Sequence, residues 1–488
     1  MNISTLFVTP EIAPWQKTGG LADFSAALPQ ALLRAGADVR VLVPRYPALA
    51  KAFSAAQPVG QIAPFAELPA ATILSARSDG GLPLLLLDCP ALYQREGNPY
   101  VTPQGIDWPD NHLRFAQLAR AAALLGSSHG PLATPAQVIH CNDWQSALCP
   151  AYLRRMDGAR AATVMTIHNL AFQGIFQASA LAAIGLPPAA YSIDALEYYG
   201  QISYLKGGLQ FAEQVTTVSP TYAQEMQEPL LGFGLDGVLR TRSRDLTGIL
   251  NGVDEAWNPA TDTHLARNYD ARSLTAKEAN RRALRAELEL DNDAATPLFG
   301  MVTRLTEQKG VDLVLECADR LLDREGDIAG QLAVLGSGEA RFEAALQALA
   351  ARHPGRAAAI IGFDERYAHR IEAGADIFLM PSRFEPCGLN QLYSLRYGTP
   401  PVVHATGGLA DTVVGCTPES LRAGRANGFV FGASEPDALL EAIRRATGAF
   451  GNKRQWRRLQ RIGMAADHSW DKAAAEYLEV YRKALMSR

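Results

Sequence analysis

Short apolar segments alternate with helical segments along most of the chain, and this alternation limits the possible folds more than any other feature. In the first half, apolar runs with the length of buried strands each lead into a turn and then into a helical segment. The strands expected there are 3–8, 39–43, 84–87, 138–140, 164–167, 215–218 and one that begins at Ile249, with helices at about 20–35 and 113–125. Such alternation predicts a parallel, doubly wound α/β sheet with right-handed crossovers.

The same pattern begins again in the second half. The expected strands are 299–303, 332–335, 359–361, 377–380 and 401–403. Residues 262–293 are expected to form a charged helical segment, 389–397 a helix, and 469–488 an amphipathic helix. Because 488 residues are too many for one ordinary core, the chain is expected to form two α/β domains.

Composition excludes several classes of protein. The hydrophobic fraction is 48% and the charged fraction 20%, as in soluble globular proteins, and the net charge of −4 gives no general attraction to nucleic acid or to an anionic membrane. No run approaches the ~18 apolar residues of a membrane span, and the N-terminus lacks the features of a signal peptide. Six scattered cysteines without a CxxC pair predict a reduced, cytoplasmic location, and their spacing supports no zinc site.

The stretch 382–413 has the features of a binding site for a phosphate and a sugar. Two glycine-containing turns, at Gly388 and at Gly407-Gly408, each precede a helical segment. Helix N-termini with unpaired N–H groups favour anions. A carboxylate beside them, Glu385, suits the hydroxyl groups of a sugar instead. Phosphate and sugar together predict a nucleotide-sugar as the ligand.

Two cations strengthen this interpretation. Arg304 follows an expected strand, and Lys309 lies near the start of the next helix, so both are placed to hold a diphosphate. Donors aimed at a departing diphosphate stabilise the transition state electrostatically, and no metal is required. The Asp291-x-Asp293 sequence is interpreted as a turn or helix cap rather than a metal site.

In the first half, candidate residues follow the ends of expected strands, where open α/β sheets bind ligands. Lys17 and the glycine pair Gly19-Gly20 open a helix, yet they match neither a Walker sequence nor a dinucleotide fingerprint. Asp143 is equally compatible with a helix cap and with a ligand contact. His168 ends another strand, and its position favours a functional role.

Other classes of function are less consistent with these patterns. An oxidoreductase needs a complete glycine fingerprint, and the Gly336-x-Gly338 sequence lacks the third glycine. A glucan-binding protein with a degenerate site is the non-catalytic alternative. The intact candidate residues argue against it: Lys17, Arg304, Lys309 and Glu385. A phosphorylase is conceivable from the two-domain layout, but no lysine context indicates pyridoxal phosphate.

Seven motifs, in order along nearly the whole chain, resemble those of the bacterial glycogen synthases, which use ADP-glucose and are close to the plant starch synthases. These motifs are Lys17-Thr18-Gly19-Gly20-Leu21-Ala22-Asp23, Asn142-Asp143-Trp144, His168-Asn169-Leu170, Asn251-Gly252-Val253-Asp254, Arg304-Leu305-Thr306 with Gln308-Lys309-Gly310, Ser382 to Leu389, and Thr406-Gly407-Gly408-Leu409-Ala410-Asp411.

The resemblance implies a GT-B fold, with two Rossmann-like domains facing each other across a deep cleft. It implies an N-terminal acceptor domain at 1–247, a C-terminal donor domain at 248–465, and a final helix at 466–488 that crosses back to the first domain. The implied reaction is the retaining transfer of glucose from ADP-glucose to the 4-hydroxyl at the non-reducing end of an α-1,4-glucan. The implied partners are these two substrates, with no cofactor, metal, nucleic acid or membrane.

The resemblance also implies a role for individual residues. Arg304 and Lys309 would bind the distal phosphate, helped by the backbone of Gly20 and Gly408, and Lys17 would close over the nucleotide-sugar. The glucose contacts would come from Glu385, Cys387, Gly388 and Leu389, with His168 and Asn169 beside the anomeric carbon. The other implied contacts are Asp143 near the acceptor, Tyr100 in the cleft, Phe363 against adenine, Asn251 on the sugar, and Asp23 and Thr406 in the nucleotide-sugar site.

The chain departs from related patterns at two places. Wider retaining GT-B families carry a second glutamate eight residues after the first, and here Tyr393 occupies that position. This disfavours a mechanism that needs paired carboxylates and favours front-face transfer, in which the leaving phosphate assists proton removal. Cys141 and Asn142 stand where the family often has His and Ala, which affects acceptor contacts rather than phosphate binding.

Overall fold

The computed structural model describes residues 3–488, and its chain divides into two compact units. Unit 1 consists of Met1–Gly252 and Trp470–Arg488, and unit 2 of Val253–Ser469. The sequence placed the first division after residue 247 and the second after 465, where the structure has 252 and 469.

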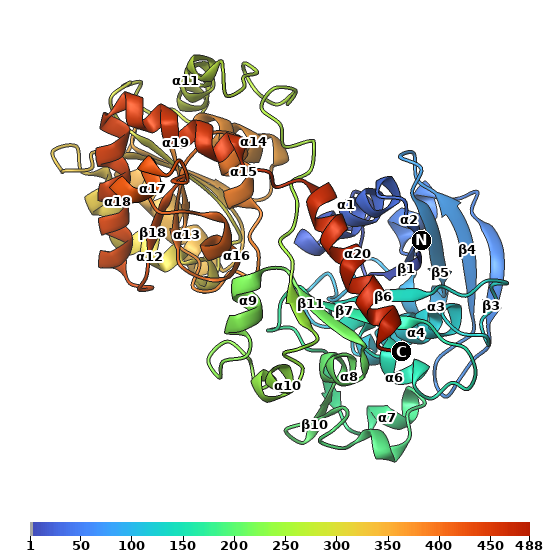
Figure 1. Ribbon diagram of the computed structural model, residues 1–488. Helices are drawn as coiled ribbons and strands as arrows, with labels where there is room; N and C mark the ends of the chain where they lie inside the picture. Colours follow the sequence, from blue (N-terminus) through green and yellow to red (C-terminus); the bar gives the residue numbers. More distant parts are fainter. Residues whose placement is uncertain (1–2) are drawn as a thin grey trace. The chain divides into compact units, whose positions relative to one another are not determined.

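Unit 1 is built on a nine-stranded sheet with the order β12-β11-β7-β6-β1-β2-β5-β4-β3 (Figure 1). Its strands are β1 (Ser4–Val8), β2 (Asp38–Pro44), β3 (Gln57–Ile62), β4 (Ala71–Arg77), β5 (Pro83–Asp88), β6 (Val138–Asn142), β7 (Ala162–Ile167), β11 (Gln214–Thr217) and β12 (Leu246–Gly248). All neighbouring strands are parallel except at the β5-β4-β3 edge. A separate antiparallel sheet contains β8 (Ile175–Gln177), β10 (Gln201–Ser203) and β9 (Glu197–Tyr198).

The longest helices of unit 1 lie against this sheet, and one of them comes from the far end of the chain. The helices are α1 (Gly20–Arg34), α2 (Pro47–Ala52), α3 (Pro90–Tyr93), α4 (Asn111–Leu125), α5 (Asp143–Ser146), α6 (Cys149–Leu153), α7 (Ala180–Ala183), α8 (Tyr204–Phe211), α9 (Pro220–Glu225), α10 (Asp236–Thr241), α20 (Trp470–Met486) and the 3₁₀ helix η1 (Pro188–Ala190). Helix α20 packs against α1 and contacts β6, β7 and β11, so the C-terminal segment completes the core of the N-terminal unit.

Unit 2 contains a wholly parallel six-stranded sheet with the order β15-β14-β13-β16-β17-β18. Its strands are β13 (Leu298–Val302), β14 (Gln331–Gly336), β15 (Ala357–Ile361), β16 (Ile377–Met380), β17 (Pro401–His404) and β18 (Phe429–Phe431). Successive side chains of β16 enter two different cores: Ile377 and Leu379 join one cluster, Phe378 and Met380 the other. Because both faces are buried, the strands are continuous apolar runs in the sequence.

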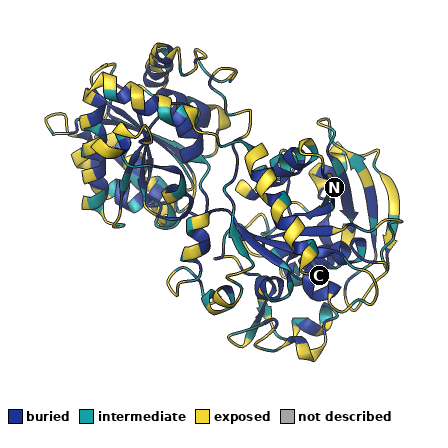
Figure 2. Cartoon of the chain, in the orientation of Figure 1, coloured by how far each residue is buried: buried dark blue, intermediate teal, exposed yellow. Residues whose placement is uncertain are grey.

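Helices cover both faces of the unit 2 sheet, and Figure 2 shows the dark, buried strands inside paler helices. These helices are α11 (Lys277–Glu287), α12 (Val311–Leu322), α13 (Ala340–Arg352), α14 (Glu365–Gly374), α15 (Asn390–Arg396), α16 (Gly407–Thr412), α17 (Pro418–Arg422), α18 (Pro436–Gly451) and α19 (Lys453–Ala465), with the 3₁₀ helices η2 (Leu274–Ala276) and η3 (Glu307–Lys309). No helix within residues 3–488 is long and apolar enough to span a membrane.

Most expected strands lie within about two residues of the observed ones, and two expectations were wrong. Residues 262–293 are not one helical segment: helical structure occupies only 274–287, and the preceding residues form loops tied by Asx-type hydrogen bonds, as at Asp262 and Asp270. The strand expected to begin at Ile249 lies earlier in the chain: β12 begins at Leu246 and ends at Gly248. The antiparallel strands β3 and β4 were not expected.

Tyr481 on α20 tests how the C-terminal helix stabilises unit 1. Its hydroxyl lies 2.8 Å from Nδ1 of His140, which is buried, and burial lowers the pKa of His140 to about 3. We expect Tyr481→Phe to leave this imidazole nitrogen without its partner and to lower the free energy of unfolding by about 1–3 kcal/mol. Urea denaturation followed by circular dichroism measures the change. The exposed Tyr191→Phe is the control, and equal effects of the two substitutions would contradict the assigned role.

Candidate functional site

Both sheets have a topological switch point, which is where open α/β sheets bind ligands. In unit 2 the strand order leaves β13 in opposite directions toward β14 and β16, so the loops after β13 and β16 meet at the switch. In unit 1 the corresponding strands are β1, with β2 on one side and β6 on the other. Predicted site residues follow these strands in both units, whereas His168 follows β7 and Phe363 follows β15.

An ion pair joins the two loops at the switch point of unit 2. The ammonium group of Lys309, after β13, lies 2.5 Å from Oε2 of Glu385, after β16, and the hydroxyl of Ser382 donates to the same oxygen at 2.9 Å. Glu385 is only 5% exposed. A buried carboxylate needs such partners because it has lost its hydration. The residue predicted to bind phosphate and the residue predicted to hold glucose are therefore in direct contact.

Glycines allow the loops around this pair to touch through their backbones. A Cβ atom on Gly407 would lie 2.0 Å from the carbonyl oxygen of Glu385, and one on Gly408 would lie 2.0 Å from that of Cys387. Gly310, with φ +68°, similarly lies against the carbonyl of Pro381. No other residue type fits at these positions without moving the loops, so the glycines are required by close packing.

Arg304 is exposed, whereas the backbone on either side of it is fixed. The N–H of Leu305 donates to the carbonyl of Ser337, and the N–H of Glu339 donates to the carbonyl of Leu305. A Cβ atom on Gly336 would lie 2.0 Å from the carbonyl oxygen of Thr303. The Gly-x-Gly sequence thus serves to pack this loop, which explains its presence without a dinucleotide.

The helix N-termini offer less to an anion than the sequence suggested. Helices α15 and α16 have only seven and six residues, so their dipoles are short. The N–H of Gly408 already donates to the carbonyls of Glu385 and Pro386, at 3.1 and 3.2 Å. A phosphate that used this N–H would have to displace those bonds, which leaves Arg304 and Lys309 as the main positive groups.

The remaining predicted residues of unit 2 lie on the loops that follow β15, β16 and β17. Phe363 follows β15 and is 78% exposed, so its ring is open to a stacking partner. Cys387 is buried, and Gly388 adopts φ +72° just before α15, while Leu389 precedes that helix directly. Thr406 begins α16 as its N-cap residue.

Tyr393 cannot replace the second glutamate of related families. Its ring stacks on Trp257 with a centroid distance of 4.0 Å and an angle of 2° between the planes. The other face of Trp257 stacks on His369 at 3.8 Å. Tyr393 is therefore part of an aromatic stack and carries no carboxylate to the site.

In unit 1, a buried carboxylate that the sequence analysis overlooked holds the Lys17 loop. Oε2 of Glu11 accepts hydrogen bonds from the N–H and the hydroxyl of Thr18, at 2.7 and 2.6 Å. Lys17 itself is exposed and pairs with Asp23 at 2.7 Å. The one signal for Glu11 in the sequence is that a charged residue follows shortly after the buried strand β1.

Packing does not explain why this loop contains glycines. Gly19 has φ −168°, which any residue adopts, and a Cβ atom there would meet no atom within 4 Å. Gly20 is exposed and is the first residue of α1, a helix of 15 residues. A bare backbone at the start of a long helix leaves room for a ligand.

The imidazole of His168 has a definite tautomer. Nδ2 of Asn142 donates to the carbonyl of Val8 at 3.0 Å, so its Oδ1 is an acceptor. Nε2 of His168 lies 3.0 Å from that oxygen and therefore carries the proton, which leaves Nδ1 as an acceptor. Burial lowers the pKa of His168 to about 3, so the ring is neutral at pH 7.

Asp143 is the first residue of the short helix α5, whose N-cap residue is Asn142, so the helix-cap interpretation of Asp143 is wrong. Its backbone has φ +53°, a strained value for a residue other than glycine. Its Oδ1 accepts the N–H of His168 at 2.7 Å. Burial raises its pKa to about 7, against the N–H groups of His168 and Asn169, with a further rise from Glu11.

Three more groups lie near this carboxylate or in the following loops. Burial, together with the charges of Glu11 and Asp143, raises the pKa of Tyr100 well above its ordinary value. Oδ1 of Asn169 accepts the N–H of Ala171. Oδ1 of Asn251 is buried and accepts no hydrogen bond from the residues that the structure describes. An unsatisfied buried acceptor of this kind is suited to a ligand hydroxyl.

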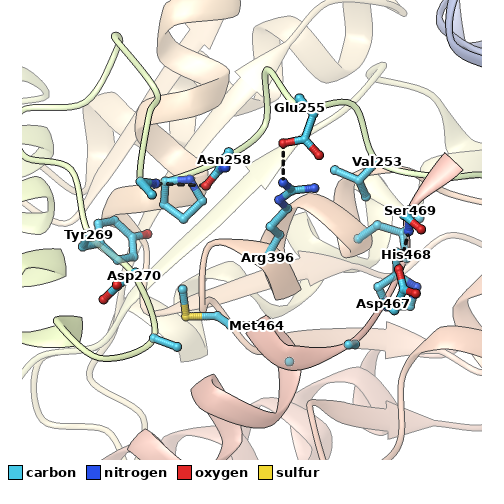
Figure 3. A pocket seen from close by; sticks show the side chains of 16 residues that line it. Val253, Glu255, Asn258, Tyr269, Asp270, Arg396, Met464, Asp467, His468 and Ser469 are labelled. Atoms are coloured by element: carbon cyan, nitrogen blue, oxygen red, sulfur yellow. Dashed lines mark hydrogen bonds and ion pairs between the residues drawn. The ribbon is translucent and has the colours of Figure 1, made fainter. Parts of the chain in front are cut away.

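A separate pocket of about 400 Å³ lies in unit 2 beside the segments that lead to unit 1 (Figure 3). The N–H of Val253 donates to the carbonyl of His468 at 2.7 Å, so the two connecting segments are joined to each other. Arg396 and Glu255 form an ion pair across the pocket. No predicted site residue lines it.

No group of three or more His, Cys, Asp or Glu residues within the described part of the chain is arranged to hold a metal ion. The six cysteines are all free thiols. Arg304 and Lys309 are the positively charged side chains of the loop that follows β13.

Comparison with known proteins agrees with this architecture. Residues 4–241 match the starch synthase catalytic domain family, and residues 281–450 match the glycosyl transferases group 1 family. The catalytic domain of starch synthase IV from Arabidopsis thaliana, in a structure bound to ADP and acarbose, superimposes with a TM-score of 0.85 at 30% identity, over 100% of both chains. A sucrose-phosphate synthase from Thermosynechococcus elongatus shares the fold, with a TM-score of 0.60 at 17% identity over 100% of both chains.

The two α/β units and these relatives define a glycosyltransferase with the GT-B fold. Glycogen synthases from Dechloromonas aromatica and Nitrosospira multiformis are 54% and 51% identical, over 100% and 99% of this chain and 99% and 98% of their own. The chain belongs to the glycogen synthase family. The family, the fold class and the enzyme class predicted from the motifs are confirmed.

The buried Glu11 makes a testable contribution to the pH dependence of stability. Burial raises the pKa of its carboxyl group from 4.5 to about 7, against the hydrogen bonds from Thr18. Between these two values the folded chain holds a proton that the unfolded chain has lost, so this group's stabilising contribution decreases as pH rises from about 4.5 to 7. We expect Glu11→Gln to reduce the loss of thermal stability between pH 5 and pH 8.

Differential scanning calorimetry at both pH values measures this effect. Glu96→Gln, at an exposed position, is the control and should follow the unmodified protein. If Glu11→Gln shows the same pH dependence as the unmodified protein, Glu11 does not retain a proton in the fold.

Proposed function

We propose that the protein transfers glucose from ADP-glucose to the 4-hydroxyl at the non-reducing end of an α-1,4-glucan, with retention of configuration, and so elongates glycogen in the cytoplasm. The observation that carries the proposal is the Lys309–Glu385 pair at the unit 2 switch point, with Arg304 nearby in sequence on the same loop. The Arabidopsis relative, whose structure holds ADP and acarbose, supports the choice of ligands. Six free thiols are compatible with a reducing compartment.

The cations of unit 2 have a defined role in this reaction. Arg304 and Lys309 bind the distal phosphate and stabilise the charge that develops on ADP as it leaves. In the free protein Lys309 is neutralised by Glu385. Binding of the donor offers Lys309 a phosphate and offers Glu385 the glucose hydroxyls, so each partner of the pair exchanges its contact for one with the substrate.

Transfer on one face of the sugar follows from the lack of a second carboxylate at position 393. The bond between the anomeric carbon and the phosphate oxygen breaks, and a bond from the same carbon to the acceptor 4-oxygen forms on the same face. The proton of that 4-hydroxyl passes to an oxygen of the departing ADP. The cations supply the positive charge, so the reaction is proposed to need no metal.

Unit 1 is proposed to supply neutral and anionic groups to the same reaction. His168 is neutral, and its unprotonated Nδ1 can only accept a hydrogen bond, so the ring is proposed to position a hydroxyl rather than to donate a proton from Nδ1. Asp143 and Asn169 are proposed to lie toward the acceptor, Tyr100 and Asn251 to contact the sugars, and Lys17 with Gly20 to contact the nucleotide-sugar.

The activity is tested by incubating the purified protein with ADP-glucose and glycogen and measuring ADP by a coupled assay. We expect ADP release that depends on glycogen and continues in excess EDTA. Nuclear magnetic resonance of a short maltooligosaccharide acceptor should show a new α-1,4 linkage. Release of no nucleotide from ADP-glucose or UDP-glucose would contradict the proposal, and activity that only Mg²⁺ restores would contradict the metal-free mechanism.

Arg304 tests the phosphate contact without disturbing the fold, because its side chain is exposed. We expect Arg304→Ala to lower kcat/KM for ADP-glucose by about 10²–10³, the effect of removing one donor from a developing negative charge. The thermal midpoint should stay unchanged. Arg324→Ala, an exposed arginine on the same unit, is the matched control. Similar activities of the two variants would remove Arg304 from the site.

Phe363 tests recognition of the base. Loss of an exposed stacking ring removes about 1–3 kcal/mol of binding, so Phe363→Ala should raise KM for ADP-glucose by about 5- to 150-fold with a smaller change in kcat. Phe363→Trp keeps an aromatic face and should retain a KM close to that of the unmodified protein. An unchanged KM in Phe363→Ala would show that the base binds elsewhere.

A further inference from the structure

A cluster of arginines in unit 2 lies apart from the residues of the proposed active site. A hollow of about 760 Å³ is lined by Arg425, which follows α17, and by Arg454, Arg458 and Arg461 of α19. The three helix residues are spaced i, i+4 and i+7, which places them on one face of the helix. All four arginines are exposed. None of the residues assigned to the donor or acceptor lines this hollow.

The opposite face of α19 explains how the arginines are held. Trp456 and Leu459 are buried in the core of unit 2, and Nε2 of Gln460 donates to the carbonyl of Gly398 at 2.7 Å. The buried face therefore fixes the rotation of the helix about its axis. The arginine face is directed away from that core as a consequence of this packing.

The charges of this face are not balanced within the fold. Some exposed arginines elsewhere in unit 2, such as Arg320, Arg341 and Arg352, pair with carboxylates. None of the four arginines of the hollow forms an ion pair within residues 3–488. Nε of Arg461 donates a hydrogen bond to the carbonyl of Ala271 at 3.3 Å. The whole chain has a net charge of −4, so this positive surface is local.

The charge pattern of α19 also lowers the stability of this helix. The helix contains Lys453, Arg454, Arg457, Arg458 and Arg461 and no acidic residue. Lys453 and Arg457, Arg454 and Arg458, and Arg457 and Arg461 are like-charged pairs at i, i+4, each of which destabilises a helix. A surface selected only for solubility mixes both signs of charge. An anionic ligand would remove the repulsion.

Hydrogen bonds fix the part of the wall of the hollow that Asn427 forms. Asn427 lines it, and its Nδ2 donates to the carbonyl of Thr412 at 2.9 Å, while its Oδ1 accepts the N–H of Val414 at 2.7 Å. The wall is thus attached to the end of α16, the helix that begins at the Gly407-Gly408 turn.

We infer that this hollow is a second anion site, which binds a small phosphate compound with several charges. Arginine forks bind phosphate oxygens in pairs, and the volume lies within the ~300–1,000 Å³ of small-molecule sites. The arginine face of α19 extends only about 10 Å, which is short for a nucleic acid that commonly makes about 6–10 phosphate contacts. The site is independent of the proposed donor site.

Inorganic tripolyphosphate is the probe, titrated into the full chain by isothermal calorimetry at constant ionic strength with saturating ADP present. Under the inference, one tripolyphosphate binds per chain although ADP occupies its own site. Arg454→Ala/Arg458→Ala should weaken this binding at least tenfold. Lys453→Ala/Arg457→Ala removes two charges from the same helix without altering the lining, and should weaken it less than threefold.

Three results would overturn the inference: no binding of tripolyphosphate in the presence of ADP, equal weakening by the two double variants, or binding of only a long polyanion such as an RNA oligonucleotide. Both variants replace exposed side chains, and thermal unfolding checks that they fold. Arg454→Lys/Arg458→Lys keeps the charge but loses the paired hydrogen bonds, so an intermediate affinity is expected from it.

Discussion

The structure of unit 2 depends on a buried ion pair, Lys309 with Glu385, that joins the loops following two neighbouring strands. Removing these charges from water is unfavourable, and the hydroxyl of Ser382 and the close contact between the pair offset only part of that. Glycines at 310, 407 and 408 let the surrounding backbones approach closely enough to enclose the carboxylate. The exchange of partners proposed above, for a phosphate and a sugar, gives this arrangement a reason to be retained.

The sequence predicted the strands and the site loops well because both follow from local rules. Strands such as β13 and β16 are buried on both faces, so they appear as uninterrupted apolar runs. Polar residues directly after such runs lie at the carboxyl edge of a parallel sheet, and this placed Arg304 and Glu385 near the same switch point. The family followed from seven motifs in order, whereas each motif alone was ambiguous.

Other features depended on tertiary contacts that no local pattern reveals. The N–H of Gly408 is already hydrogen bonded to the loop of Glu385, so the apparent anion site at that turn is occupied by the protein itself. Glu11 acts through Thr18, seven residues away, and the tautomer of His168 depends on an asparagine held by another strand. Residues 262–273 contain charged residues of the kind found on an exposed helix. Asp262 and Asp270 in this segment stabilise turns instead.

A crystal structure of the protein with ADP tests the central claim most directly. The account predicts that the diphosphate lies at the unit 2 switch point, within hydrogen-bond distance of both Arg304 and Lys309, and that Lys309 has moved away from Glu385. Density for ADP at any other place, such as the pocket beside Arg396, with the Lys309–Glu385 pair intact, would contradict it.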